Sequence, residues 1–327
     1  MISQGTLLVT LVKLVDCLPM PAPPAKRGRG HPKVYTDRLF LKALVIMIVR
    51  HLHTVHELLA VLAQPTAEMQ ELRSLLSEQE RFPSRRTWER RLQAIPASEP
   101  AQIGCLGRHL VNLIQPWQEC GRAVAVDSTV LRARGGLWHQ KHREKGEVPH
   151  TSIDTQAHWT KSGWHGWVYG SPLHVVCVVA GVWFPLAAML TPANIADSDP
   201  APELLREVPA EVRFVLGDRH YNTPELRETC EQDDRLLVAT KYGSYPHTDD
   251  GVEVRRIFHN LRSLSIENFN EHFKGIFDGH GQVPTKGLIP TQRFALGAIF
   301  VYQLALLYRF ENDLDLCVGL KAFLKAA

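Results

Sequence analysis

The spacing of apolar residues along the chain changes near residue 120. Before that point, apolar positions recur every three or four residues, which is the period of an amphipathic helix. After it, they form short β-branched runs bounded by Gly, Pro, Asn and Asp, which is the pattern of buried strands. The change predicts an all-α N-terminal region, residues 1–119, followed by an α/β domain, residues 120–327.

Five helices are expected in the N-terminal region. Thr36 is a suitable N-cap, and the apolar periodicity after it predicts one helix that runs to about Leu62. Ser84 is a suitable cap for a later helix. The predicted helices are 5–18, 37–62, 67–79, the one that follows Ser84, and 99–117.

A basic linker at 19–35 interrupts these helices. It is rich in Pro and Gly and is therefore expected to be extended. Its basic residues would either follow a DNA backbone or enter a minor groove, or the segment is a plain solvated linker. These residues are Lys26, Arg27, Arg29 and Lys33.

The helix after Ser84 carries a cluster of arginines. Trp88 and Leu92 share its expected inner side, and the arginines are expected on the outer side. A turn followed by a basic helix is the outline of a DNA-reading module, although charge-rich surface helices are also common. The arginines are Arg85, Arg86, Arg90 and Arg91.

The second part of the chain predicts a mixed sheet flanked by helices. Three strands come first, two of them joined tightly around Gly181, and helices and strands then alternate. The last helix is apolar but contains Gln303 and is short for a membrane span, so a buried core helix is expected. The strands are 122–127, 173–180, 183–190, 212–217 and 235–240, and the helices are 198–207, 223–232, 264–277 and 291–309.

The net charge of the whole chain does not indicate a nucleic-acid partner, but the distribution of charge along the chain is more informative. The net charge is only +3 over 327 residues. Residues 1–119 hold 15 Lys and Arg against 10 Asp and Glu, whereas the remainder holds 22 against 24. A basic front part ahead of a mildly acidic part fits DNA capture followed by metal-dependent cutting. The six cysteines are scattered without a C-x-x-C pair, which is typical of reduced thiols in the cytoplasm.

Three acidic residues follow or precede apolar runs in a way that suggests a metal site. Asp127 ends one β-branched run, Asp218 closes another, and Glu267 lies in the predicted helix 264–277. Carboxylates at the ends of two strands and on a nearby helix make an oxygen-only site suited to Mg²⁺. Two such ions can clamp the attacking and leaving oxygens of a phosphodiester. Taken singly, each residue also fits a turn or a solvated face.

The sequence segments around these three residues resemble the signature blocks of DDE insertion-sequence transposases. The blocks are VAVDST, LGDRHYNTPEL and IENFNEHFKGIF, around Asp127, Asp218 and Glu267. The intervening WHGWVYGSPLHVVCVVAGVWFPLAAMLTPANIADS is also similar to the family's pattern. The resemblance covers roughly residues 120–280 and, more weakly, the N-terminal GHPKVYTDRLFLKALV.

The resemblance implies a fold, a chemistry and a set of partners. It implies an RNase-H-like core in which the first Asp lies on the first strand and the second Asp at the end of the fourth. It implies an endonuclease that cuts and joins element ends with Mg²⁺ or Mn²⁺, two ions in all, held by Asp127, Asp218 and Glu267. Terminal inverted repeats, target DNA and a homodimer in a synaptic complex are the implied partners, and a cytoplasmic, nucleoid-associated location without a membrane is expected.

The third block departs from the family's pattern at the basic residues that accompany its glutamate. Lys274 stands where the family has a lysine, and it is expected to hold a phosphate beside the metals; a surface lysine is the alternative. Ser263 occupies the arginine position and Asn260 the tyrosine position, so Arg262 is the nearest basic candidate, off by one. Only about 26 residues separate the fifth strand from Glu267, which leaves room for a hairpin at most.

The long loop expected at 132–170 interleaves aromatic and basic residues. Such a segment suits stacking on unpaired bases, with Trp164 the candidate for DNA contact, whereas Trp167 is expected to enter the core.

Two other functions stay open from the sequence. One is a catalytically silent DNA-binding relative, such as a domesticated protein or a decayed element copy, and the other is an RNase-H-fold nuclease that cuts without joining.

Overall fold

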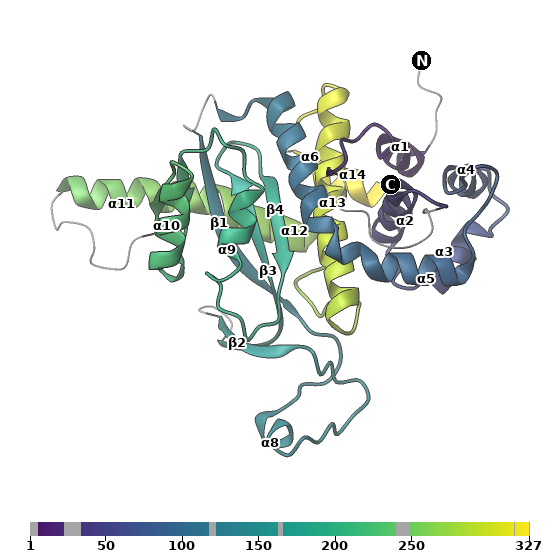
Figure 1. Ribbon diagram of the computed structural model, residues 1–327, viewed down its shortest axis with the longest axis horizontal. Helices are drawn as coiled ribbons and strands as arrows, with labels where there is room; N and C mark the ends of the chain where they lie inside the picture. The colour runs from purple at the N-terminus through teal and green to yellow at the C-terminus, as the bar shows by residue number, and fades with distance from the viewer. Residues whose placement is uncertain are drawn as a thin grey trace.

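A computed structural model describes residues 6–22, 34–117, 122–162, 166–239, 249–316 and 318–326. A mixed sheet with helices on its sides occupies the middle of the molecule, and a group of short helices lies beside it (Figure 1). This arrangement confirms the predicted fold class, an α/β sheet preceded by an all-α region.

The sheet has the order β2-β3-β1-β5-β6, and β4 pairs with β3. β1, β3 and β4 are antiparallel neighbours, whereas β5 and β6 run parallel to β1. The predicted tight connection around Gly181 is confirmed, because Val178 pairs with Phe184 across it. The strands are β1 (Ala123–Arg132), β2 (His158–Ser162), β3 (Gly166–Val178), β4 (Phe184–Leu190), β5 (Phe214–Leu216) and β6 (Leu236–Val238).

Helices precede the sheet, alternate with its later strands, and then cover it. Those before β1 are α1 (Leu7–Leu14), α2 (Asp37–Val49), α3 (Val55–Leu62), α4 (Ala67–Leu75), α5 (Arg85–Ala94) and α6 (Glu99–Ile114). Those after it are α8 (Gln140–Arg143), α9 (Ala201–Arg206), α10 (Pro224–Gln232), α11 (Asp249–Arg262), α12 (Asn268–Ile276), α13 (Leu288–Glu311) and α14 (Leu320–Ala326).

Helix α13 holds the two regions together. It contacts α2 and α6 of the N-terminal region and β4 of the sheet. One hydrophobic cluster therefore extends from Leu8 to Leu324. By length and composition α13 could cross a membrane, but 83% of its most apolar window is buried inside the structure. The expected buried core helix at 291–309 is confirmed.

The helix expected from Thr36 to Leu62 is two helices. The chain leaves α2 through His51, whose φ of 52° is left-handed. α3 then starts on a capping box, in which Thr54 Oγ1 accepts from the Glu57 backbone N–H while Glu57 accepts from the Thr54 N–H. Two caps inside one periodic stretch thus override the helical period.

The segment before the third block contains a helix where a loop was expected. Residues 240–248 lie outside the described part, but α11 covers Asp249–Arg262 and continues toward α12. Val254, Ile257, Phe258 and Leu261 have helical spacing, which the neighbouring Gly and Asp residues obscured. α11 projects past the edge of the sheet in Figure 1.

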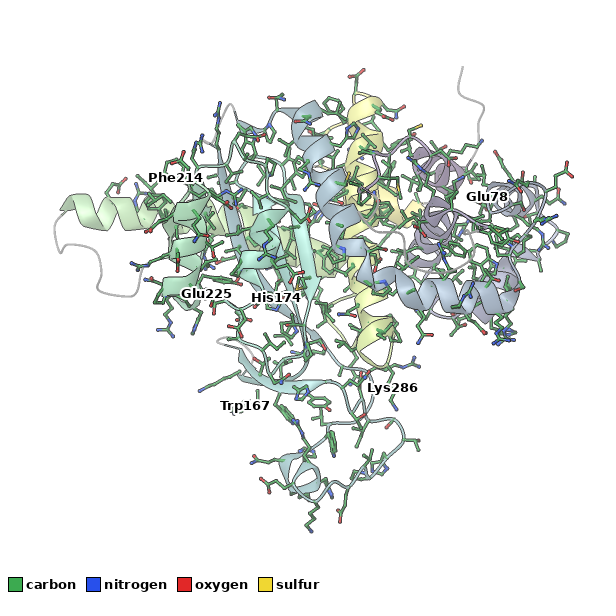
Figure 2. The ribbon with its side chains drawn as sticks, in the orientation of Figure 1. Glu78, Trp167, His174, Phe214, Glu225 and Lys286 are labelled. Carbon is green, nitrogen blue, oxygen red and sulfur yellow. The ribbon has the colours of Figure 1, made fainter. Side chains whose placement is uncertain are left out.

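Much of the predicted loop 132–170 is also ordered. It forms α8, β2 and the first residues of β3, and extends as an arm below the sheet in Figure 1. Ala133, Ala157 and Tyr169 make a small core of their own, with Trp138 and Trp159 packed against it. Trp167 lies beyond that core and is 67% exposed, so the expectation that it enters the core was wrong (Figure 2).

A buried histidine on β3 makes stability depend on pH. His174 is fully buried, and its Nε2 lies 2.8 Å from Thr191 Oγ1 (Figure 2). Burial lowers the pKa of His174 to about 4, against a weaker opposing effect of Asp199. A lowered pKa stabilises the fold while the unfolded imidazole is neutral, and this stability is lost as pH falls from about 6.5 toward 4.

Wild type should therefore lose more stability than His174→Gln between pH 7 and pH 4.5, by about 2–3 kcal/mol. Urea unfolding of both proteins at the two pH values measures the difference. Other titrating groups cancel in the comparison, and parallel pH dependences would contradict the assignment.

Candidate functional site

Asp127 lies on β1, and Asp218 follows β5, the strand that pairs with β1 in parallel. Ala125 of β1 pairs with Leu216 of β5, and each aspartate stands two residues further along the chain. Because the two strands run in the same direction, both carboxylates reach the same end of the paired segment. Asp218 begins a short 3-10 turn, and its Oδ1 accepts from the His220 backbone N–H at 2.7 Å. β1 continues to Arg132, five residues beyond Asp127.

Glu267 reaches the same place from the helical side. It ends a π turn, Ser263–Glu267, which joins α11 to α12 and packs against β1 and β3. Arg262, the residue before this turn, contacts both carboxylates. Its Nη2 donates to Glu267 Oε1 at 2.5 Å, and its Nη1 lies 3.9 Å from Asp127 Oδ1. The three predicted site residues Asp127, Arg262 and Glu267 are thus in contact.

The π turn explains how an arginine five residues before Glu267 can meet it. In a regular α-helix, five residues rotate a side chain to about 140° from its starting direction. A π turn stacks residues i and i+5 instead. The π turn contains one residue more than a regular helical turn. Arg262, five residues before Glu267, therefore points in the direction that position 263 would have in a regular helix, and it can take the place of the arginine that Ser263 replaces.

The charges of the site converge on Asp127. Burial raises the pKa of Asp127 to about 7, Arg262 and the Ser128 backbone N–H lower it, and Asp218 and Glu267 raise it. An anionic, oxygen-only donor set of this kind fits a hard divalent cation. Within the described residues, no three acidic, His or Cys side chains already stand as a complete ligand group. The donor chemistry fits the metal, while Arg262 supplies positive charge between two of the carboxylates.

Lys274 lies beside this cluster. Its side chain is only 15% exposed, and Gly279 packs against its Cα and Cβ. Burial lowers the pKa of Lys274, Glu271 and Asp127 raise it, and Arg132 lowers it. The ammonium group is therefore close enough to Asp127 to be influenced by its charge, which fits a lysine directed toward the site.

Two further residues near the carboxylates were missed or misassigned from the sequence. In the family's pattern, the segment Asn194-x-x-Asp197 is expected to cap the next helix and steady the site, but that helix begins after Pro200 without a side-chain cap. Burial raises the pKa of Asp197, the Ser128 hydroxyl lowers it and Asp218 raises it. Tyr221 is buried, and the three aspartates Asp127, Asp197 and Asp218 add to the rise of its pKa. An acidic residue after a strand was the available signal for Asp197.

The arginines of α5 fall into two groups. Trp88 and Leu92 are fully buried as predicted, and Ser84 Oγ accepts from the Thr87 N–H. Arg85, Arg86 and Arg90 are exposed. Arg91 is not on the outer side: it is ion-paired with Asp37, its guanidinium lies 4.5 Å from the Phe40 ring centroid, and only 17% of its side chain is exposed. Arg91 therefore packs α5 against α2.

Trp164 and the linker residues Lys26, Arg27, Arg29 and Lys33 lie outside the described residues.

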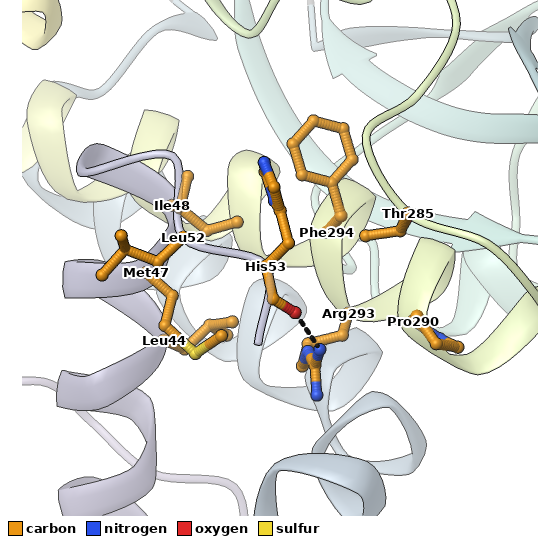
Figure 3. Close-up of a pocket in the computed structure, with 9 residues that line it drawn as sticks. All are labelled: Leu44, Met47, Ile48, Leu52, His53, Thr285, Pro290, Arg293 and Phe294. Carbon is orange, nitrogen blue, oxygen red and sulfur yellow. Dashed lines mark hydrogen bonds between the residues drawn. The ribbon is translucent and has the colours of Figure 1, made fainter. Parts of the chain in front are cut away.

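The pocket in Figure 3 is separate from the carboxylates. It lies between the end of α2 and the start of α13, and Arg293 Nη2 donates to the His53 carbonyl at its side. Its lining is mostly apolar and includes none of the three predicted metal ligands. The three carboxylates therefore lie outside this pocket.

Solved structures with some likeness to this chain are transposases. A synaptic complex of piggyBac transposase with hairpin DNA aligns over 98% of this chain and 75% of that chain, with 10% identity and a TM-score of 0.43. A pre-cleavage Mos1 transpososome aligns over 88% and 80%, with 13% identity and a TM-score of 0.23. A Mos1 transposase paired-end complex with the left transposon end aligns over 94% and 92%, with 15% identity and a TM-score of 0.24. No curated protein matches the chain.

The sequence itself gives the decisive comparison. The Transposase DDE domain family matches residues 118–303, which is more than half of the chain and contains all three carboxylates. Members of this family depend on divalent metal ions for catalysis. The chain therefore belongs to the DDE transposase family: it is a DNA transposase, an enzyme of DNA cleavage and transfer.

Proposed function

We propose that this transposase cuts and joins the ends of an insertion-sequence element, with Asp127, Asp218 and Glu267 as its catalytic metal ligands. The observation that carries the proposal is the convergence of these residues. Asp127 lies on β1 and Asp218 lies just after the end of β5, its parallel neighbour, and Arg262 contacts Asp127 and Glu267 together. The three residues are separated by 91 and 49 positions in the sequence, and only the folded sheet brings them close.

The proposed cofactor is Mg²⁺ or Mn²⁺, as two ions. When bound, the ions would stabilise the charge that develops on the attacking and leaving oxygens of a phosphodiester. Asp127 lies between the other two carboxylates electrostatically, since both raise its pKa, and it is therefore the proposed ligand to both ions. Asp218 and Glu267 would each complete one coordination sphere.

The basic helpers are proposed to orient groups around this site. Arg262 would hold Glu267 in position and offset the repulsion between Glu267 and Asp127. Lys274, mostly buried and near Asp127, would hold a DNA phosphate beside the reacting one. The reaction would be attack by water, which frees a 3′-hydroxyl, and then attack by that hydroxyl on target DNA.

The N-terminal region is proposed to bind the terminal inverted repeats. Its exposed arginines on α5, together with Lys26, Arg27, Arg29 and Lys33 of the linker, supply the charge for phosphate contacts. Trp164 is proposed to contact DNA. We further propose residues 1–119 as the DNA-binding and dimerisation region, residues 120–327 as the catalytic domain, a homodimer as the synaptic form, and a cytoplasmic, nucleoid-associated location.

The first test replaces each ligand by its isosteric amide. Asp127→Asn, Asp218→Asn and Glu267→Gln should each reduce strand cleavage more than roughly 100-fold, because a lost metal ligand costs about 3 kcal/mol or more of transition-state stabilisation. The substrate is a duplex carrying the DNA that flanks both ends of the gene, with Mg²⁺. Glu225→Gln, an exposed carboxylate on α10, is the matched control. Near wild-type cleavage by any of the three would remove that residue from the site.

The second test concerns the α5 arginines. The triple change of Arg85, Arg86 and Arg90 to Ala should weaken DNA binding and reduce the slope of log K against log salt by about 2–3, because three phosphate contacts are lost. Arg91→Ala should instead leave the slope unchanged and lower the free energy of unfolding by about 1 kcal/mol. Fluorescence anisotropy across salt concentrations and urea unfolding measure the two effects. Equal salt slopes for wild type and the triple variant would place DNA binding elsewhere.

The third test detects the metal without DNA or activity. Mn²⁺ at about 100 times its dissociation constant should stabilise the wild-type fold by about 2.7 kcal/mol, since binding to the native state alone shifts the unfolding equilibrium. The rise in Tm should disappear in Asp127→Asn and persist in Glu225→Gln. An equal rise in Asp127→Asn would show that Mn²⁺ binds at another place.

A further inference from the structure

The π turn before Glu267 needs partners for its backbone. A π turn contains one residue more than an α-helical turn, so carbonyl groups near it lose their regular i+4 donors. The Ser265 hydroxyl donates to the carbonyls of Leu261 and Arg262, at 2.9 and 3.1 Å. These bonds come from within the turn itself and cannot fix its position against the sheet.

The carbonyl of Leu264 is bonded from outside the helix. Trp183 Nε1 donates to it at 3.1 Å across 81 residues of sequence, and Asn268 Nδ2 donates at 3.3 Å. Leu264 lies in the middle of the turn, and its own side chain is 62% exposed. The hydrogen bond from the Trp183 indole N–H therefore connects the sheet to the π turn.

Trp183 itself is held firmly. It directly precedes Phe184, the fully buried first residue of β4, at the tight connection from β3. Its ring makes an edge contact with His272 of α12, with centroids 5.0 Å apart at 67°. His272 Nδ1 lies 3.2 Å from the Tyr302 hydroxyl of α13. The indole is thus placed by both the sheet and the central helix.

We infer that Trp183 is a positioning residue for the transposase reaction: its indole N–H holds the π turn in the register that brings Arg262 onto Glu267 and Asp127. This inference rests on the proposed function, because it concerns the same carboxylates. Without the π register, five residues of regular α-helix would rotate Arg262 about 140° from Glu267. In the described part of the chain, Trp183 makes no hydrogen bond to the three carboxylates, and it acts through the turn.

The main experiment is a double-mutant cycle. Trp183→Phe keeps the ring on His272 and removes the N–H, and should reduce the cleavage kcat roughly tenfold, the value of one hydrogen bond, with DNA affinity unchanged. Arg262→Ala alone should reduce it about ten- to hundredfold. If Trp183 acts through Arg262, adding Trp183→Phe to Arg262→Ala should cost less than about twofold more.

Trp117→Phe is the matched control for loss of an indole N–H. Trp117 Nε1 donates to Glu211 Oε1 at 3.4 Å, and this bond involves no residue of the third block. This variant should cleave DNA at the wild-type rate. A tenfold loss from Trp183→Phe in both the wild-type and the Arg262→Ala backgrounds would reveal a general packing role and overturn the inference.

Failure of the inference and of the proposed function give different results. If Asp127→Asn abolishes cleavage while Trp183→Phe has no effect, the catalytic site stands and the role of Trp183 is rejected. If Asp127→Asn cleaves DNA normally, the proposed site itself is rejected.

Discussion

The proposed site depends on a fold that holds three carboxylates near one another, just beyond the paired residues of the parallel strands β1 and β5. Burial and the neighbouring charges of Asp218 and Glu267 raise the pKa of Asp127 to about 7, because each of them disfavours the charged carboxylate. Arg262 offsets part of that cost by contacting two of the three side chains. The packing of the surrounding core, in which β1 is buried between β3 and β5, offsets the rest of this unfavourable free energy. A rigid sheet is therefore a condition for the site and not only its scaffold.

Helix α13 extends this rigidity to the N-terminal region. Since it packs on α2, α6 and β4 at once, the helices that carry the exposed arginines share a core with the strands that carry the carboxylates. DNA held by α5 would then keep a constant relation to the site. The arm formed by β2 and α8 differs, because it has a small core of its own and leaves Trp167 exposed.

Most elements of the fold could be predicted from local patterns. The apolar periods predicted every strand of the antiparallel and parallel parts except β2, and they predicted the buried helix α13. The errors arose where local signals competed. The Thr54 capping box split a long periodic stretch, and Gly and Asp residues concealed the start of α11. Arg91 was expected on the surface because its charge suggested solvent, whereas Asp37 and the Phe40 ring provide it with a packed environment.

The sequence by itself indicated which three carboxylates form the candidate site and in which order they occur. It could do so because the strands, the helix and the sequence segments around Asp127, Asp218 and Glu267 are local properties of the chain. It could not determine which arginine meets Glu267, since position 263 holds a serine and Arg262 would point away from Glu267 in a regular helix. Tertiary structure decided this point. The Leu264 carbonyl of the π turn accepts from Trp183, which lies 81 residues before Leu264 and adjoins it only after the sheet has formed.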